Sequence, residues 1–114
     1  MKPDRINNTD AHRYVTSRVE FVGSNMFAED VRKDEQAVMY VVYSYGYHFP
    51  MYAFDYTINE WLGNQDKYSP TTSRHQSRAR PNRIDKWYDT STLIQIIAAG
   101  GTVNYIASKL KKAA

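Results

Sequence analysis

The residues best suited to chemistry lie between Lys67 and Lys86, where the chain reads KYSPTTSRHQSRARPNRIDK. Six side chains in this segment are cationic, and Asp85 is its only acid. Arginine forks and short hydroxyls bind the oxygens of phosphates and carboxylates. The segment therefore predicts an anion-binding surface with these expected residues: Lys67, Tyr68, Thr72, Ser73, Arg74, His75, Arg78, Arg80, Arg83, Lys86 and Trp87.

The hydroxyls of this segment predict a short helix over about residues 72–80, which Pro81 would stop. Ser73 with Gln76 fits a capping box, and the free amides of a helix start attract anions. We expect Thr72, Ser73 and His75 to bind the anion there. Capping alone also explains the hydroxyls, but it does not explain four arginines within ten residues.

Charge is divided unevenly along the chain. Residues 1–66 carry a net charge of −4 and residues 67–114 a net charge of +7, within a total of +3 over 114 residues. Ten residues are tyrosines, and eight of these lie between Tyr40 and Tyr88. Cations among aromatic rings are typical of proteins that bind single strands, because the cations neutralise phosphates and the rings stack on bases. Tyr68 or Trp87 is the expected stacking residue. The alternative is that many of the rings form the core.

Several classes of chemistry have no support in the sequence. Cysteine is absent, which excludes disulfides, thiolate metal sites and a cysteine nucleophile. The three histidines, His12, His48 and His75, have no metal-ligand spacing, and no phosphate-binding loop or nucleophile elbow occurs. We therefore expect no metal, no cofactor and no assigned catalytic residue. One enzymatic alternative stays open, in which His48 and His75 meet as the acid and base of a metal-independent ribonuclease.

The pattern of apolar residues predicts one α+β domain over residues 1–114, with a loose terminus over 1–12. Its expected centre is a small antiparallel β-sheet formed by a hairpin over about 37–57, with further strands at 14–22 and 60–62. Residues 37–45 alternate large apolar side chains on both faces, as in a central strand covered on both sides. Residues 24–36 predict a short helix or an ordered loop.

The last third of the chain predicts two helices that pack on one face of the sheet. The stretch DTSTLIQIIAAGG begins the first, Gly100-Gly101 ends it, and Thr102 caps the second. A DNA-binding helix-turn-helix has the same outline, but the second helix offers few side chains for reading bases. The apolar stretch Leu93–Ala99 is too short to span a bilayer, and residues 1–5 lack the apolar run of a signal peptide. A cytoplasmic protein without membrane contact is expected.

Two strings in the sequence carry a resemblance. YSYG at residues 43–46, Trp61, and KYSPTTSRHQ at residues 67–76 resemble a family of small, uncharacterised bacteriophage proteins with YSYG, a tryptophan and KYSxTTSxHQ in this order. That family has no assigned activity. The resemblance implies a phage origin, and hence the cytoplasm of an infected bacterium, and such small phage proteins often act on host machinery.

Together these observations predict a non-enzymatic phage accessory protein that binds a polyanion, with single-stranded nucleic acid favoured. The alternative is a protein-interaction inhibitor of a host complex, directed at transcription or at defence, including the anti-CRISPR type. The ribonuclease is the third hypothesis. Whether the chain pairs with a second copy through its tyrosine-rich sheet stays open.

Overall fold

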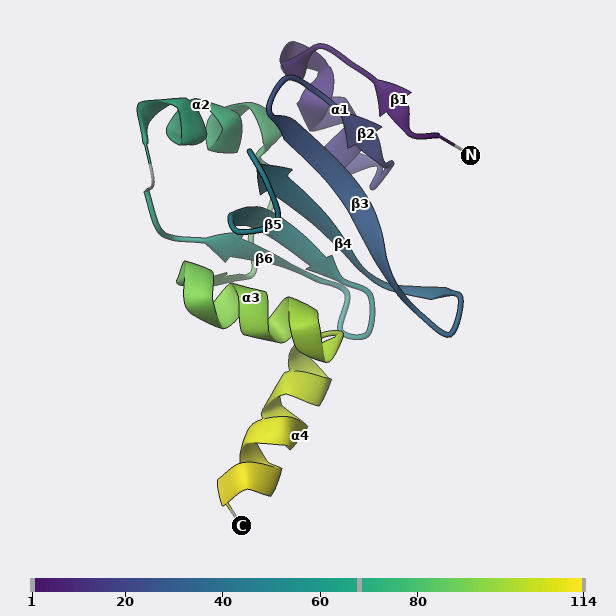
Figure 1. Cartoon of the computed structure of the whole chain (residues 1–114), viewed down its shortest axis with the longest axis vertical. Coiled ribbons are helices and arrows are strands. Elements are labelled where there is room, and N and C mark those ends of the chain that lie inside the picture. Colours follow the sequence, from purple (N-terminus) through teal and green to yellow (C-terminus); the bar gives the residue numbers. More distant parts are fainter. Residues whose placement is uncertain (1, 68, 114) are drawn as a thin grey trace.

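The protein is built around one mixed sheet, whose seven described strands lie side by side in chain order (Figure 1). The computed structural model describes residues 2–67 and 69–113. Strand β1 pairs parallel with β2, and β6 pairs parallel with β7, whereas the other neighbours are antiparallel. The strands are β1 (Asp4–Arg5), β2 (Phe21–Val22), β3 (Met26–Lys33), β4 (Gln36–Ser44), β5 (Pro50–Asp55), β6 (Glu60–Asn64) and β7 (Lys86–Tyr88).

Helical elements lie on both faces of the sheet. On one face the short helix α1 and helix α2 cover the strands, and on the other face α3 covers them (Figure 1). The helices are η1 (Asn8–Asp10), α1 (Ala11–Thr16), α2 (Pro70–Ala79), α3 (Thr90–Ala99) and α4 (Thr102–Ala113). The α+β class predicted from the sequence is therefore confirmed.

The predicted small antiparallel sheet is wrong, because the sheet is large and mixed. Three of its strands, β1, β2 and β7, contain only two or three residues, too few to show a period of two. Residues 24–36, predicted as a helix or loop, contain the eight-residue strand β3. Its partly exposed polar residues, such as Glu29 and Asp30, hide the alternation.

Strand β4 has the central position that its sequence predicts. It lies between β3 and β5, and residues Met39 to Ser44 are all buried. Met39 and Val41 belong to the core beneath α3, whereas Tyr40 and Val42 belong to the core beneath α1 and α2. The period of two thus supplies apolar surface to both faces, as expected of a strand covered on both sides.

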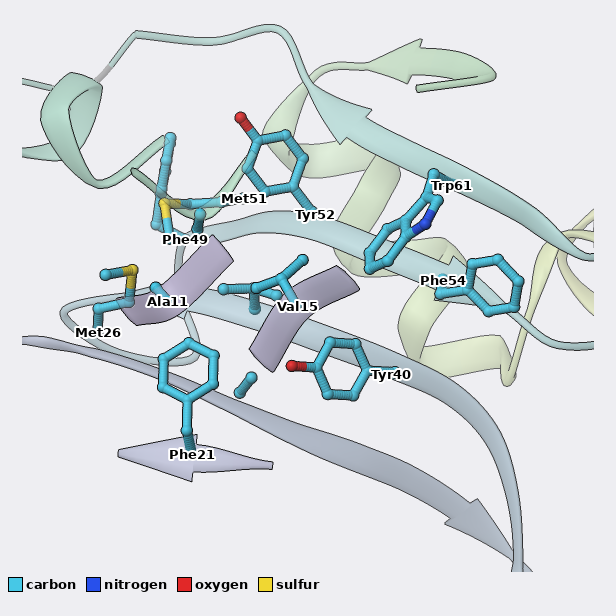
Figure 2. Close-up of a cluster of buried hydrophobic side chains, with 13 residues drawn as sticks. Ala11, Val15, Phe21, Met26, Tyr40, Phe49, Met51, Tyr52, Phe54 and Trp61 are labelled. Carbon is cyan, nitrogen blue, oxygen red and sulfur yellow. The ribbon is translucent and has the colours of Figure 1, made fainter. Parts of the chain in front are cut away.

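The core between the sheet and α1 and α2 is rich in aromatic rings (Figure 2). Tyr40 is fully buried and donates its hydroxyl to the carbonyl of Val19 at 2.8 Å, so its polar atom is satisfied. The Trp61 ring meets Tyr40 and Phe54 edge to face, at centroid distances of 6.2 and 5.2 Å. Each fully buried large side chain stabilises the fold by about 1.5–3 kcal/mol.

The N-terminal region also differs from its prediction. The expected strand over 14–22 is helix α1 up to Thr16, and only Phe21–Val22 form a strand. Ala11 and Val15, one helical turn apart, are both completely buried, which explains the helix. The segment 1–12, predicted as a loose terminus, contains β1, η1 and the start of α1.

Of the two C-terminal helices, only α3 packs closely on the sheet. Asp89 caps it by accepting from the Thr92 amide at 2.8 Å, and the left-handed Gly100 ends it. The Thr102 amide donates to Asp55 at 2.8 Å, which fixes the start of α4 to the end of β5. Helix α4 then projects from the body (Figure 1). The prediction that both helices pack on the sheet is therefore wrong for α4.

The exposed apolar residues of α4 explain why its sequence predicted a helix packed on the sheet. Val103, Ile106 and Leu110 form the stripe that was expected to be buried, yet Leu110 is 67% exposed. Tyr105, on a different side of the helix, contacts the core beneath α3 instead. The turn at Gly100-Gly101 therefore sets which side of α4 faces the sheet, and amphipathicity alone does not.

Candidate anion-binding surface

Helix α2 begins two residues earlier than predicted. Ser69, not Thr72 or Ser73, is its N-cap, and the Ser69 hydroxyl accepts from the Thr72 amide at 3.1 Å. Pro70 occupies the first turn, where its fixed φ angle and missing amide fit a helix start. The helix ends at Ala79 with Arg80 as the C-cap.

The buried side of α2 contains two residues that were predicted to bind the anion. Thr72 is buried and accepts a hydrogen bond from the Ser69 hydroxyl at 3.1 Å. His75 is 5% exposed, and its Nδ1 lies 2.7 Å from the Ser44 hydroxyl in β4. Its ring also lies against Tyr45, with centroids 5.6 Å apart. These contacts give both residues structural roles.

The surroundings of His75 disfavour the charged form of its imidazole. Burial lowers the pKa of its imidazole, and the nearby charges of Arg74 and Arg78 lower the pKa further. A ring that is buried and hydrogen-bonded in this way is poorly placed to exchange protons with a substrate. No observation therefore favours the ribonuclease hypothesis.

The solvent-facing side of α2 carries Arg74, Ser77 and Arg78. Arg74 donates to the Thr71 hydroxyl at 3.4 Å. Within the described part of the chain, neither arginine has a carboxylate at ion-pair distance. Ser73, also predicted to bind the anion, lies at the edge of this side and is partly buried.

Two of the six predicted cations are neutralised. Arg83 Nε lies 2.6 Å from Asp85 Oδ1, and Lys86 Nζ lies 3.1 Å from Glu60 Oε1. Asp85 Oδ2 also accepts from the Trp61 amide at 2.9 Å, and this bond, with Arg83, lowers the pKa of the Asp85 carboxyl. We call Arg83 and Lys86 the paired cations. We call Lys67, Arg74, Arg78 and Arg80 the free cations, because none of them has a carboxylate at ion-pair distance among residues 2–67 and 69–113.

A small pocket opens between the end of α2, the loop before it and strand β7. Its volume is about 60 Å³. Two free cations, Lys67 and Arg80, line it, and no carboxylate among the described residues does. Its described lining residues are Tyr52, Asn64, Lys67, Gln76, Ser77, Arg80 and Trp87. The Arg80 guanidinium lies 5.5 Å from the centre of the Trp87 ring, which is 44% exposed.

Buried hydrogen bonds hold the walls of this pocket together. Gln76 Nε2 donates to the carbonyls of Asn64 and Asp66 at 3.4 and 3.2 Å, which joins the loop carrying Lys67 to α2. The Tyr52 hydroxyl donates to the Gln76 carbonyl at 2.7 Å. These bonds bring Lys67 and Arg80, thirteen positions apart in the sequence, to one site.

Two side-chain donors occupy carbonyls at the end of α2. The last carbonyls of a helix repel negative charge unless donors occupy them. The Gln76 carbonyl is occupied by Tyr52, and the Arg80 carbonyl accepts from His12 Nδ1 at 2.7 Å. His12 was considered from the sequence only as a catalytic or metal candidate. In the structure it donates a hydrogen bond to the C-cap residue of α2.

Sequence reasoning placed neither Asn64 nor Gln76 at a binding pocket, and it considered Tyr52 only as one of the aromatic rings among the cations. Tyr52 and Asn64 are buried in the sheet, and Gln76 was read only as part of a capping box. Gly63 pairs with Trp87 across β6 and β7, and a Cβ at Gly63 would lie 2.7 Å from the Trp87 ring. The signal that could have indicated this site was the glycine within a strand, because such a glycine often marks a place where another group packs closely against the backbone.

The remaining predicted features are placed as follows. Tyr68 lies outside the described residues. Tyr45, Tyr47 and Trp87 expose their rings, whereas the Tyr52 ring is buried. Among residues 2–67 and 69–113, no group of three potential metal ligands occurs, and none of the helices has the length and apolar character needed to cross a bilayer.

Comparisons with known proteins add no relative. The chain matches no protein-family model, no curated protein and no solved structure. The resemblance to bacteriophage proteins therefore stays a prediction, and the function has to be argued from the surface itself.

Proposed function

We propose that the protein binds single-stranded nucleic acid through the outer side of α2 and the adjacent pocket. One observation carries this proposal: the four free cations are gathered at α2 and its pocket, whereas the paired cations are already neutralised. Cations without an ion-pair partner can neutralise phosphates without first breaking an ion pair.

The aromatic residues favour a single strand over a duplex. Trp87 lies beside Arg80 at the pocket, and Tyr45 lies against His75 of α2 with its own ring half exposed. Unpaired bases offer their faces to such rings, while bases in a duplex are stacked on each other. The proposed ligand is therefore a single strand whose phosphates follow α2.

Fluorescence anisotropy tests this proposal directly. Labelled single-stranded DNA, single-stranded RNA and duplex DNA are titrated with the protein over a series of salt concentrations. We expect micromolar or tighter binding of a single strand that weakens steeply with salt, because bound phosphates release counterions. The variant R78E/R80E should abolish it. Absence of binding at low salt refutes the proposal.

A second candidate function is docking on a host protein, and helix α4 favours it. Val103, Ile106 and Leu110 expose an apolar stripe on a helix that projects from the body. Contiguous exposed apolar residues often mark protein contacts. The variant V103S/I106S/L110S tests this candidate: loss of a host partner from a pull-down, with nucleic-acid binding unchanged, would support it. An unchanged set of partners would count against it.

A further inference from the structure

The pocket beside α2 has the size of a phosphate group and not of a base. A buried water needs roughly 10–15 Å³ of the volume that the centre of a water molecule can reach. The pocket offers about 60 Å³ of this volume, which is room for about four waters. A phosphate has five heavy atoms, whereas a nucleobase with its ring substituents is too large. We propose that this pocket binds the terminal phosphate of a single strand, an inference that rests on the proposed function.

The charges in the pocket fit a terminal phosphate better than an internal one. A phosphomonoester carries about −1.5 to −2 charges at pH 7 and presents three acceptor oxygens. An internal phosphodiester carries a single charge and has two free oxygens. Lys67 and Arg80 supply two positive charges, Ser77 adds a hydroxyl donor, and none of the described lining residues is a carboxylate. Both cations are exposed, so an anion of similar charge can reach them from solvent.

The partly exposed Trp87 ring in the pocket lining suits the base of the same terminal nucleotide. Trp87 lines the pocket with Arg80 above its ring, and both guanidinium and indole groups stack on bases. Trp87 can lie close to β6 only because Gly63 has no side chain. The rest of the strand would then follow the outer side of α2, where Arg78 and Arg74 lie one helical turn apart.

Gln76 is the positioning residue of this pocket. Its side chain is buried and donates to the carbonyls of Asn64, at the end of β6, and Asp66, in the loop, so it fixes the loop that carries Lys67 relative to Arg80. Gln76→Leu removes both donors while keeping much of the volume. We expect this variant to lose preference for a terminal phosphate and to keep the general affinity that Arg74 and Arg78 provide.

The test compares three labelled single strands of one sequence: 5′-phosphorylated, 3′-phosphorylated and without a terminal phosphate. We expect the protein to bind one phosphorylated strand about tenfold more tightly than the unphosphorylated strand. Lys67→Gln should remove this preference, because Lys67 lies in the pocket. Arg74→Gln removes the same charge outside the pocket. It should weaken the binding of all three strands equally and keep the preference for the terminal phosphate. Circular dichroism confirms that both variants fold.

The outcomes separate this inference from the proposed function. Equal affinity for the three strands overturns the terminal-phosphate pocket and leaves single-strand binding intact. If no strand binds, the proposed function fails, and nuclear magnetic resonance with 5′-AMP, 3′-AMP and adenosine then decides on the pocket alone. Shifts of the Trp87 indole signal with one nucleotide but not with adenosine support it, and equal spectra overturn it. Millimolar inorganic phosphate should compete only with the preferred phosphorylated strand.

Discussion

The two parts of the basic segment, Lys67–Arg80 and Arg83–Lys86, both carry lysine and arginine but differ in whether these cations have carboxylate partners. In the first part, four cations lack carboxylate partners among the described residues and face solvent or a small pocket. In the second part, Asp85 and Glu60 neutralise both cations. One of these acids is a near neighbour, and the other lies on β6, far away in the sequence.

The difference shows that the number of cations in a segment does not tell which of them are available to bind a ligand. Helix α2 turns its arginines outward because its buried side is filled by Thr72, His75, Gln76 and Ala79. The strand that follows places Lys86 beside Glu60, because β7 pairs with β6. Secondary structure and strand pairing thus decide which cations can bind a ligand.

The largest expected effect comes from removing free cations. R74Q/R78Q and R83Q/K86Q lower the net charge equally, so they form a matched pair. The first variant should weaken single-strand binding at least about tenfold and lower the salt slope by about 1.4, at about 0.7 per phosphate contact. The second should change the affinity less than about twofold. Anisotropy over a salt series measures both, and equal effects would remove the distinction between the two parts.

The next prediction concerns pH and uses His75. Because burial and two arginines lower the pKa of His75 in the folded protein, the unfolded chain binds its proton first as the pH falls. The free energy of unfolding should therefore decrease from about pH 7 to pH 5, through the ordinary histidine pKa of about 6.5. His75→Gln should reduce this dependence in urea unfolding experiments.

The same histidine reports on the free cations. R74Q/R78Q removes the two charges that lower the pKa of His75, so nuclear magnetic resonance should show this pKa moving upward. R83Q/K86Q serves as the control and should leave the pKa of His75 unchanged. An unchanged pKa in both variants would show that burial alone controls the imidazole.

A smaller effect follows from releasing a paired cation. Asp85→Asn removes the negative partner of Arg83 while its amide oxygen can still accept from the Trp61 amide. We expect single-strand affinity to rise about two- to threefold, because one more cation becomes free. Glu60→Gln should act similarly through Lys86. Unchanged affinity in both variants would show that these cations lie outside the path of the strand.

The smallest expected effect on binding comes from Gly63→Ala. The new methyl group would lie 2.7 Å from the Trp87 ring, so the indole has to move. Overpacking of this kind destabilises a protein by about 1–3 kcal/mol. We expect about twofold weaker binding and altered tryptophan emission, with Trp87→Phe as the control that identifies the emitting ring. Identical emission would show that the strand pair adjusts without moving Trp87.

The sequence predicted features that depend on local pattern and missed those that depend on strand pairing. The alternation over residues 37–45 predicted β4 and its two buried faces. The parallel edge strands β1 and β7 were missed because their two or three residues carry no period, and they form only where another strand offers an edge. The same limit applies to the site, where the outer arginines were predictable and the roles of Gln76 and Asn64 were not.

The projecting helix α4 has a practical consequence for how the molecule is handled. In Figure 1 the end of α4 and helix α2 lie at opposite ends of the long axis. Attachment to a support through the end of α4 therefore keeps the α2 surface directed away from that support. The protein can be coupled to a sensor chip or bead through α4 with its cationic surface left open to solution.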